Sequence, residues 1–228
     1  MTIATCDTLS PMSGCYQLCA DGIDGPTDRS YWVVEGRFAA GGYPSEKGYT
    51  GSGPTPEKLE FLVDAGIDVF INLTQDYPGG TDSEMSHYDP GLGGSAEIVR
   101  FPIPDEHLPA CPLGGDEERE TAYRMSRDDE SSPHCPNEQS ISEMKKILDR
   151  IDTALDVGQN VYVHCWGGSG RTGTVVGCWL RRHGLFAVDE VLEGLQELRQ
   201  AGDREGGWKR TPNTFAQAEF IVSWGEGE

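Results

Sequence analysis

Cys165 and Arg171 are the residues whose types and spacing most directly suggest chemistry, because a short stretch of unusual composition separates them. Its positions are Trp166, Gly167, Gly168, Ser169 and Gly170. Glycines allow successive backbone N–H groups to point toward one centre, which creates a binding site for an anion. The guanidinium of Arg171 can form two parallel hydrogen bonds with a tetrahedral oxyanion. Because positive surroundings favour the thiolate form of cysteine, the stretch predicts a phosphate-binding loop that carries a sulfur nucleophile.

The sequence on either side of this loop predicts a strand before it and a helix after it. Residues 160–164 form a short β-branched run that is typical of a buried strand. Residues 172–180 are apolar over a helical length, so the positive end of a helix adds to the loop's N–H groups. Two other interpretations fit less well. One is a plain glycine-rich turn with a buried cysteine, and the other is a nucleotide-binding loop, for which the Gly-Lys-Ser/Thr motif is missing.

Together with these glycines, His164, Cys165, Arg171 and Thr172 resemble the signature of the cysteine-dependent protein tyrosine phosphatases, above all the compact dual-specificity branch and its bacterial relatives. The resemblance implies a metal-free phosphomonoester hydrolase without a cofactor, in which Cys165 attacks phosphorus. Arg171 and the loop N–H groups would hold the phosphate oxygens, Thr172 would hydrogen-bond the sulfur and His164 would support the loop. A Thr-Pro-x-Thr-x-x-Gln pattern resembles one in bacterial relatives and suggests that Gln217 positions water, with a structural glutamine as the alternative.

An acidic residue for proton transfer is expected directly after the strand predicted at residues 97–104. A phosphate ester releases an alkoxide or phenoxide, and this leaving group needs a proton. In the family that the loop resembles, the general acid is an aspartate just after such a strand, often behind a proline. Asp105 follows Pro104 and matches this pattern, so we expect it to be the general acid. Glu106 and Asp76 are the alternatives, and the non-functional interpretation of Asp105 is a solvated loop charge.

The hydrophobic pattern of the rest of the chain predicts an α/β fold with a single, mainly parallel central sheet flanked by helices. The phosphate loop would connect a strand to a helix of this layered structure. Hydroxyl, proline and capping-box patterns predict where three of the helices begin. These starts are Thr55-Pro56-Glu57, the pair Ser140 and Glu143, and Thr211-Pro212-Asn213-Thr214.

A chain of 228 residues is long enough for one catalytic domain with extensions, which we expect over residues 31–225. Residues 1–30 lack an apolar period, so the sequence predicts an irregular N-terminal extension. Residues 108–139 are polar and form an insertion behind the general-acid loop. This insertion would either rim the active site or be a disordered or decorative loop.

The net charge is −20, from 38 acidic and 18 basic residues, and it disfavours nucleic acid and anionic membranes as partners. No apolar run is long enough to span a membrane, and the N-terminus lacks the features of a signal peptide, so a cytoplasmic location is expected. The seven cysteines show no Cys-x-x-Cys spacing, which disfavours a metal site. The six besides Cys165 would be free or paired, and one of them could resolve an oxidised Cys165.

We expect a phosphorylated protein as substrate, with phosphotyrosine first and phosphoserine or phosphothreonine next. Relatives that prefer inositol lipids often carry lysines inside the loop, and this loop has none. The alternatives are a small phosphorylated metabolite or an inositol phosphate as substrate, and a catalytically weak phosphoprotein-binding module. A sulfurtransferase with a loop cysteine and a redox sensor are two further alternatives.

Overall fold

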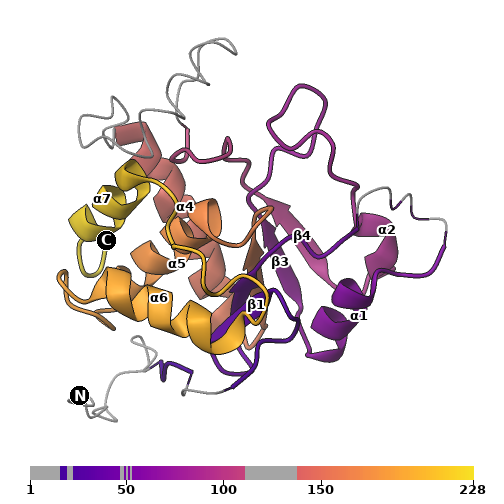
Figure 1. Ribbon diagram of the computed structural model, residues 1–228, viewed down its shortest axis with the longest axis horizontal. Helices are drawn as coiled ribbons and strands as arrows, with labels where there is room; N and C mark the ends of the chain where they lie inside the picture. Colours follow the sequence, from indigo (N-terminus) through magenta and orange to yellow (C-terminus); the bar gives the residue numbers. More distant parts are fainter. Residues whose placement is uncertain (1–15, 20–22, 47–48, 50, 52, 111–137) are drawn as a thin grey trace.

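The computed structural model describes residues 16–19, 23–46, 49, 51, 53–110 and 138–228. Within these residues the chain forms a central sheet with the strand order β1-β2-β5-β3-β4 (Figure 1). Neighbouring strands are parallel except β1 and β2, which pair antiparallel. The mainly parallel sheet confirms the predicted α/β class. The strands are β1 (Ser30–Val34), β2 (Phe38–Gly41), β3 (Val69–Asn72), β4 (Glu97–Arg100) and β5 (Val161–His164).

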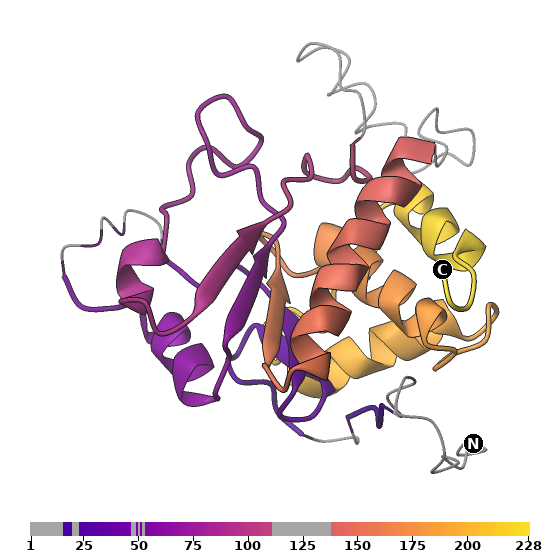
Figure 2. The same ribbon diagram turned by 180° about the vertical axis from the view of Figure 1, so that it is seen from behind.

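Helices cover both faces of the sheet, as both views of the ribbon show (Figures 1 and 2). The larger group on one face consists of α4 to α7, and the smaller group on the other consists of α1 and α2. Their bounds are α1 (Glu57–Asp64), α2 (Asp89–Leu92), α4 (Glu138–Asp156), α5 (Gly170–Arg182), α6 (Val191–Gly202) and α7 (Phe215–Ser223).

Alternation along the strands explains this two-sided core. In β5, Val161 and Val163 pack into the cluster that contains α4 to α7, whereas Tyr162 between them packs into the cluster with α1 and α2. The same alternation places Val69 and Ile71 of β3 on one face and Phe70 on the other. A strand that buries both faces reads as a continuous apolar run, which is why residues 160–164 predicted a buried strand.

The register of the parallel strands decides where the functional loops meet. His164 at the end of β5 pairs with Gly41 of β2 on one side and with Asn72 of β3 on the other. Asn72 in turn pairs with Arg100 of β4. Because four parallel strands end in one row, the loops that follow them converge at one edge of the sheet.

The three predicted helix starts lie close to the observed ones, but the capping residues differ from the prediction in each case. The first helix begins at Glu57 with Pro56 as its N-cap, so the hydroxyl of Thr55 is not the cap. α4 already begins at Glu138, which places Ser140 inside the helix instead of at a capping box.

The last helix begins at Phe215 and not at Thr211. Its N-cap is Thr214, which forms a capping box with Gln217. The hydroxyl of Thr211 instead donates to the carbonyl oxygen of Ser169 in the phosphate loop, at 2.8 Å.

The predicted extension and insertion lie partly outside the described residues. Residues 1–15, 20–22 and 111–137, with Cys6, Cys15, Cys111 and Cys135, belong to that part. In the described part of the extension, the ring of Tyr16 packs 4.8 Å from the ring of Trp179. The three described cysteines are free. No helix in the described part of the chain has the length and apolar character needed to cross a membrane.

Candidate active site

Cys165 follows β5 directly and is almost fully buried, with 3% of its surface exposed. It lines a cavity of about 680 Å³. Asp105, which precedes it by 60 residues in the sequence, lines the same cavity, and so do Trp166, Gly167, Ser169 and Gly170 of the loop. The structure therefore brings the predicted nucleophile, the predicted acid and most of the predicted phosphate loop to one hollow.

Gly168 shows why the loop requires glycine. Its φ angle is +73°, a left-handed conformation that side chains of L-residues rarely adopt. A Cβ atom at this position would also lie 2.6 Å from the carbonyl carbon of Gly41 at the end of β2. The backbones of the loop and of β2 thus approach each other closely, and the N–H of Tyr43 donates to the carbonyl oxygen of Trp166 at 3.0 Å.

Arg171 is held by a carboxylate that the sequence did not single out. Its Nη1 and Nη2 donate to the two carboxylate oxygens of Asp82 at 2.6 and 2.9 Å, and both side chains are buried. Nη1 also donates to the carbonyl oxygen of Ile103 at 3.0 Å. Burial alone would raise the pKa of Asp82, but the hydrogen bonds and charge of Arg171 outweigh burial and lower it. The pair fixes the plane of the guanidinium group.

The remaining edge of this guanidinium faces the predicted acid. Nη2 lies 2.8 Å from Oδ1 of Asp105, whose side chain is 43% exposed. The buried Nε of Arg171 has no hydrogen-bond partner among the described residues. Nε and Nη2 share one edge of the group, and Asp105 occupies Nη2 of that edge, so an oxyanion could pair with the whole edge only by displacing Asp105 from Nη2.

Thr81 and Asp82 connect the arginine to the acid loop. The N–H of Asp105 donates to Oγ1 of Thr81 at 3.0 Å, and the Thr81 hydroxyl donates to Asp82 at 3.1 Å. Sequence reasoning missed both residues. Only the strand order could have indicated them. Their loop follows β3, which is parallel to β5, so it begins at the same sheet edge as the phosphate loop.

The two alternatives for the acid lie in different places. Asp76 is buried and accepts hydrogen bonds from the hydroxyl of Tyr43 at 3.0 Å and from Nδ2 of Asn72 at 2.9 Å, so it holds neighbouring loops together. Glu106 lines the cavity beside Asp105 and has a left-handed φ of 63°. Such a conformation is uncommon for glutamate and is typical of backbone held in place by its surroundings.

His164 lies fully buried behind the loop. Its Nδ1 is 3.3 Å from the carbonyl oxygen of Cys165, which can only accept, so Nδ1 carries the proton. Burial lowers the pKa of His164 to about 3, and the neutral ring then accepts from the hydroxyl of Tyr88 through Nε2 at 2.6 Å. The hydroxyl of Thr172 lies 3.5 Å from the carbonyl oxygen of Gly41, and that oxygen accepts the hydrogen bond.

Gln217 is fully buried beside the loop. Besides its capping box with Thr214, its Nε2 donates to the carbonyl oxygen of His107 at 3.3 Å. A Cβ atom at Gly170 would lie 3.2 Å from its Oε1. The side chain therefore lies against both the acid loop and the phosphate loop, and its hydrogen bonds to Thr214 and His107 are structural ones.

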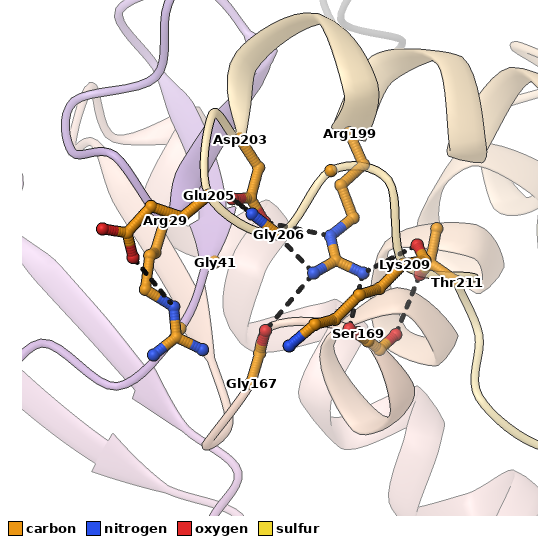
Figure 3. A network of polar contacts seen from close by, with 12 residues as sticks. Arg29, Gly41, Gly167, Ser169, Arg199, Asp203, Glu205, Gly206, Lys209 and Thr211 are labelled. Carbon is orange, nitrogen blue, oxygen red and sulfur yellow. Dashed lines mark hydrogen bonds and ion pairs between the residues drawn. The ribbon is translucent and has the colours of Figure 1, made fainter.

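Arg199 of α6 is a second buried arginine that the sequence did not indicate (Figure 3). Its Nη1 donates to Oγ of Ser169 at 2.5 Å and to the carbonyl oxygen of Lys209 at 3.3 Å. Nη2 donates to the carbonyl oxygen of Gly167 at 3.4 Å, and Nε to the carboxylate of Asp203 at 3.1 Å. One guanidinium thus bonds to the phosphate loop at Ser169 and Gly167 and to the segment after α6 at Lys209.

Comparisons with known proteins agree with this arrangement. The family model described as "Tc-R-P: Polymorphic toxin system, DSP-PTPase phosphatase" matches residues 121–185, which include the loop. The crystal structure of Tk-PTP in the active form is 23% identical, with 82% of this chain and 90% of that chain covered and a TM-score of 0.51. Kinase associated phosphatase is 17% identical, with 81% of this chain and 83% of that chain covered and a TM-score of 0.52. PTPMT1 in complex with PI(5)P is 14% identical, with 83% of this chain and 90% of that chain covered and a TM-score of 0.51. The chain therefore has the fold of the cysteine-dependent protein tyrosine and dual-specificity phosphatases.

Proposed function

We propose that the protein is a phosphomonoester hydrolase, most readily a protein phosphatase, that works through a cysteinyl-phosphate intermediate. The observation that carries this proposal is the position of Arg171. Its guanidinium contacts Asp105 at 2.8 Å, and both Cys165 and Asp105 line one cavity. A nucleophile, a cation for the phosphate and a proton donor are the groups that this chemistry requires.

In the first step the thiolate of Cys165 attacks phosphorus in line with the leaving oxygen. The S–P bond forms while the P–O bond breaks, and the ester oxygen keeps the electron pair and takes a proton from Asp105. Arg171 and the N–H groups from Trp166 through Arg171 hold the equatorial oxygens, on which the negative charge collects. The phosphate replaces Asp105 at Nη2 of Arg171, which frees the carboxyl group to reach the leaving oxygen.

In the second step water attacks the cysteinyl-phosphate. The carboxylate of Asp105 takes a proton from this water, and the S–P electrons return to sulfur, which releases inorganic phosphate. Thr172 is assigned to the departing sulfur, a role in which its hydroxyl leaves the carbonyl oxygen of Gly41. Gln217, whose side chain bonds to Thr214 and His107, is assigned the structural role. His164 keeps the loop carbonyl of Cys165 in place and remains neutral.

Three observations support a phosphorylated protein as the substrate. The loop between Cys165 and Arg171 carries no lysine that would meet the extra phosphates of an inositol ring. Two exposed tryptophans, Trp166 and Trp208, line the cavity and offer apolar surface to a peptide. Kinase associated phosphatase has the same fold. The inositol phosphate alternative is supported by PTPMT1, whose structure was solved with PI(5)P.

The test is hydrolysis of p-nitrophenyl phosphate and phenyl phosphate across pH, with a chelator present. We expect turnover by the wild type and none by Cys165→Ser. Asp105→Asn should lose the alkaline limb of the profile and should slow phenyl phosphate by about 10²- to 10⁴-fold, more than the nitrophenyl ester with its better leaving group.

Asp89→Asn is the matched control. Asp89 is 44% exposed and contacts Arg100 at 2.7 Å, nearly as Asp105 contacts Arg171, but it is not part of the cavity lining. It should retain the wild-type profile. An inactive wild type that still binds vanadate would replace the hydrolase by the phosphoprotein-binding module, and loss of activity with the chelator would contradict the metal-free mechanism.

A further inference from the structure

The segment between α6 and α7, residues 203–214, forms one wall of the cavity, and we call it the rim loop. Trp208, Lys209, Arg210 and Asn213 of this loop line the cavity together with Cys165. Lys209 and Arg210 are exposed, and neither forms an ion pair with any residue that the structure describes. Two adjacent free cations are notable in a chain with a net charge of −20.

Buried contacts hold the rim loop against the phosphate loop, as Figure 3 shows. Arg199 donates to carbonyl oxygens of both loops, at Gly167 and at Lys209. The Asp203 carboxylate accepts from the N–H of Gly206 at 2.7 Å, and the hydroxyl of Thr211 donates to Ser169.

These bonds fix the distance between the two loops without using the charge of either rim cation. In Figure 3 the side chain of Lys209 extends toward Gly167. The backbone that carries the two cations is therefore held beside the phosphate loop before any ligand binds.

The aromatic side chains beside these cations are exposed to an unusual degree. Trp208 is 75% exposed and Trp166 is 55% exposed. Nζ of Lys209 lies 5.5 Å from the centroid of the Trp208 ring, a cation–π distance that keeps the ammonium group at the rim. Tryptophan and arginine are the residue types that most often dominate binding to a polypeptide.

We propose that Lys209 and Arg210 form a second anion subsite, which binds an acidic side chain next to the phosphorylated residue of a peptide. The proposal rests on the hydrolase function above and specifies its substrate class. Trp166 and Trp208 cover the apolar parts of the same peptide. Polyol phosphates, which also carry several anionic groups, bring little apolar surface for two tryptophans to bury, so the structure favours the peptide.

The experiment compares two phosphotyrosine peptides that differ only in flanking Glu or Gln residues, with an inositol bisphosphate as a third substrate. The wild type should prefer the Glu peptide in kcat/KM by roughly 2- to 30-fold, the range for two exposed ionic contacts. This preference should shrink as salt is added, because salt screens exposed charges. Lys209→Gln combined with Arg210→Gln should bring the Glu/Gln ratio close to one.

Lys58→Gln combined with Lys146→Gln is the control, since it removes the same total charge from positions outside the rim loop. Neither residue is part of the cavity lining, so the Glu/Gln ratio should stay at its wild-type value. Equal ratios in the rim and control variants, or a wild type without preference, would overturn the subsite. The peptide class would be overturned if the inositol bisphosphate had a higher kcat/KM than the Glu peptide and if only its kcat/KM fell when the two cations were replaced.

Binding of both peptides to Cys165→Ser, measured by fluorescence anisotropy, separates this proposal from the hydrolase function. Suppose that the wild type hydrolyses neither peptide, that the Glu peptide binds more tightly than the Gln peptide, and that the rim substitutions remove this difference. The subsite proposal is then supported and the hydrolase proposal fails. If the wild type turns over and neither assay shows a preference, the subsite fails alone.

Discussion

Arg171 and Asp82 form a bidentate ion pair at 2.6 and 2.9 Å, with side chains that are 1% and 4% exposed. The pair occupies one edge of the guanidinium, and on the other edge Nη2 contacts Asp105 while Nε has no partner among the described residues. A carboxylate thus orients the cation that we propose to bind the phosphate, so that its remaining donors point in one direction before any substrate arrives.

Asp82→Asn is expected to lower both stability and catalysis. Removing one charge of a buried pair costs about 3–5 kcal/mol, and the low end applies because Asp105 still neutralises Arg171. The loosened guanidinium should reduce kcat/KM by roughly 10- to 100-fold. Urea unfolding and p-nitrophenyl phosphate kinetics on the folded fraction measure the two effects.

Asp149→Asn is the control for this pair. Asp149 is 68% exposed and contacts Arg182 at 2.8 Å. Exposed pairs contribute about 0–1 kcal/mol, so both measurements should stay near wild type. Equal effects of the two substitutions would show that Asp82 has no special part in orienting Arg171.

Local spacing was sufficient to predict Cys165, Arg171 and the strand–loop–helix around them, because these features depend on neighbouring residues. Asp105 could be proposed because it directly follows a strand of recognisable pattern. Asp82 could not, since its loop contains several acidic residues and only the pairing of β3 with β5 selects the one that reaches Arg171.

Arg199 escaped prediction for a different reason. On the sequence it lies four residues before Asp203, a spacing that is usual for an exposed helical ion pair. No local pattern distinguishes a buried arginine from an exposed one. Its burial follows from the packing of α6 against β1 and α5, which places its guanidinium behind the phosphate loop.

Arg199→Lys should weaken binding of the anion without abolishing the fold. Lysine keeps the charge opposite Asp203 but has no planar fork for Ser169, Gly167 and Lys209 at once. We expect vanadate to bind roughly tenfold or more weakly, and kcat/KM to fall in parallel. Isothermal titration with vanadate, on protein whose circular dichroism matches the wild type, measures the effect.

Arg181→Lys provides the comparison, because Arg181 donates to the carbonyl oxygens of Phe186 and Trp224, which do not line the cavity. Its affinity for vanadate should equal that of the wild type. The positioning role of Arg199 would be refuted by a similar loss of affinity in both lysine variants.

Gly168→Ala should lower the stability of the protein by more than the left-handed conformation of residue 168 alone accounts for. Gly36 has a similar φ of 67° but no atom within 4 Å of an added Cβ, whereas the added Cβ of Gly168 meets the backbone of Gly41. Gly36→Ala should cost about 1–2 kcal/mol from the left-handed conformation. Gly168→Ala should cost more and should also weaken vanadate binding, which Gly36→Ala should leave unchanged. Equal stability losses would contradict the close approach of the two backbones.

The buried His164 should make the free energy of unfolding depend on pH in the acid range. Burial lowers its pKa in the folded state to about 3, against 6.5 for an ordinary histidine. Between these values the unfolded chain binds a proton that the folded chain does not, so stability is lost as the pH falls below 6.5. The contribution of this one residue is about 1.4 kcal/mol per pH unit, and it vanishes above pH 6.5.

The measurement is urea unfolding of the wild type and of His164→Asn at several pH values from 7.5 down to 4.5. Both proteins lose stability in acid as their carboxylates are protonated, so the informative quantity is the difference between the two slopes. Below pH 6 the wild type should lose about 1.4 kcal/mol more per unit than the variant, and above pH 7 the slopes should coincide. His87→Asn, which removes a half-exposed histidine, is the control. Parallel slopes for the wild type and His164→Asn in acid would mean that the ring takes up its proton inside the fold, which is incompatible with a neutral Nε2 that accepts from Tyr88.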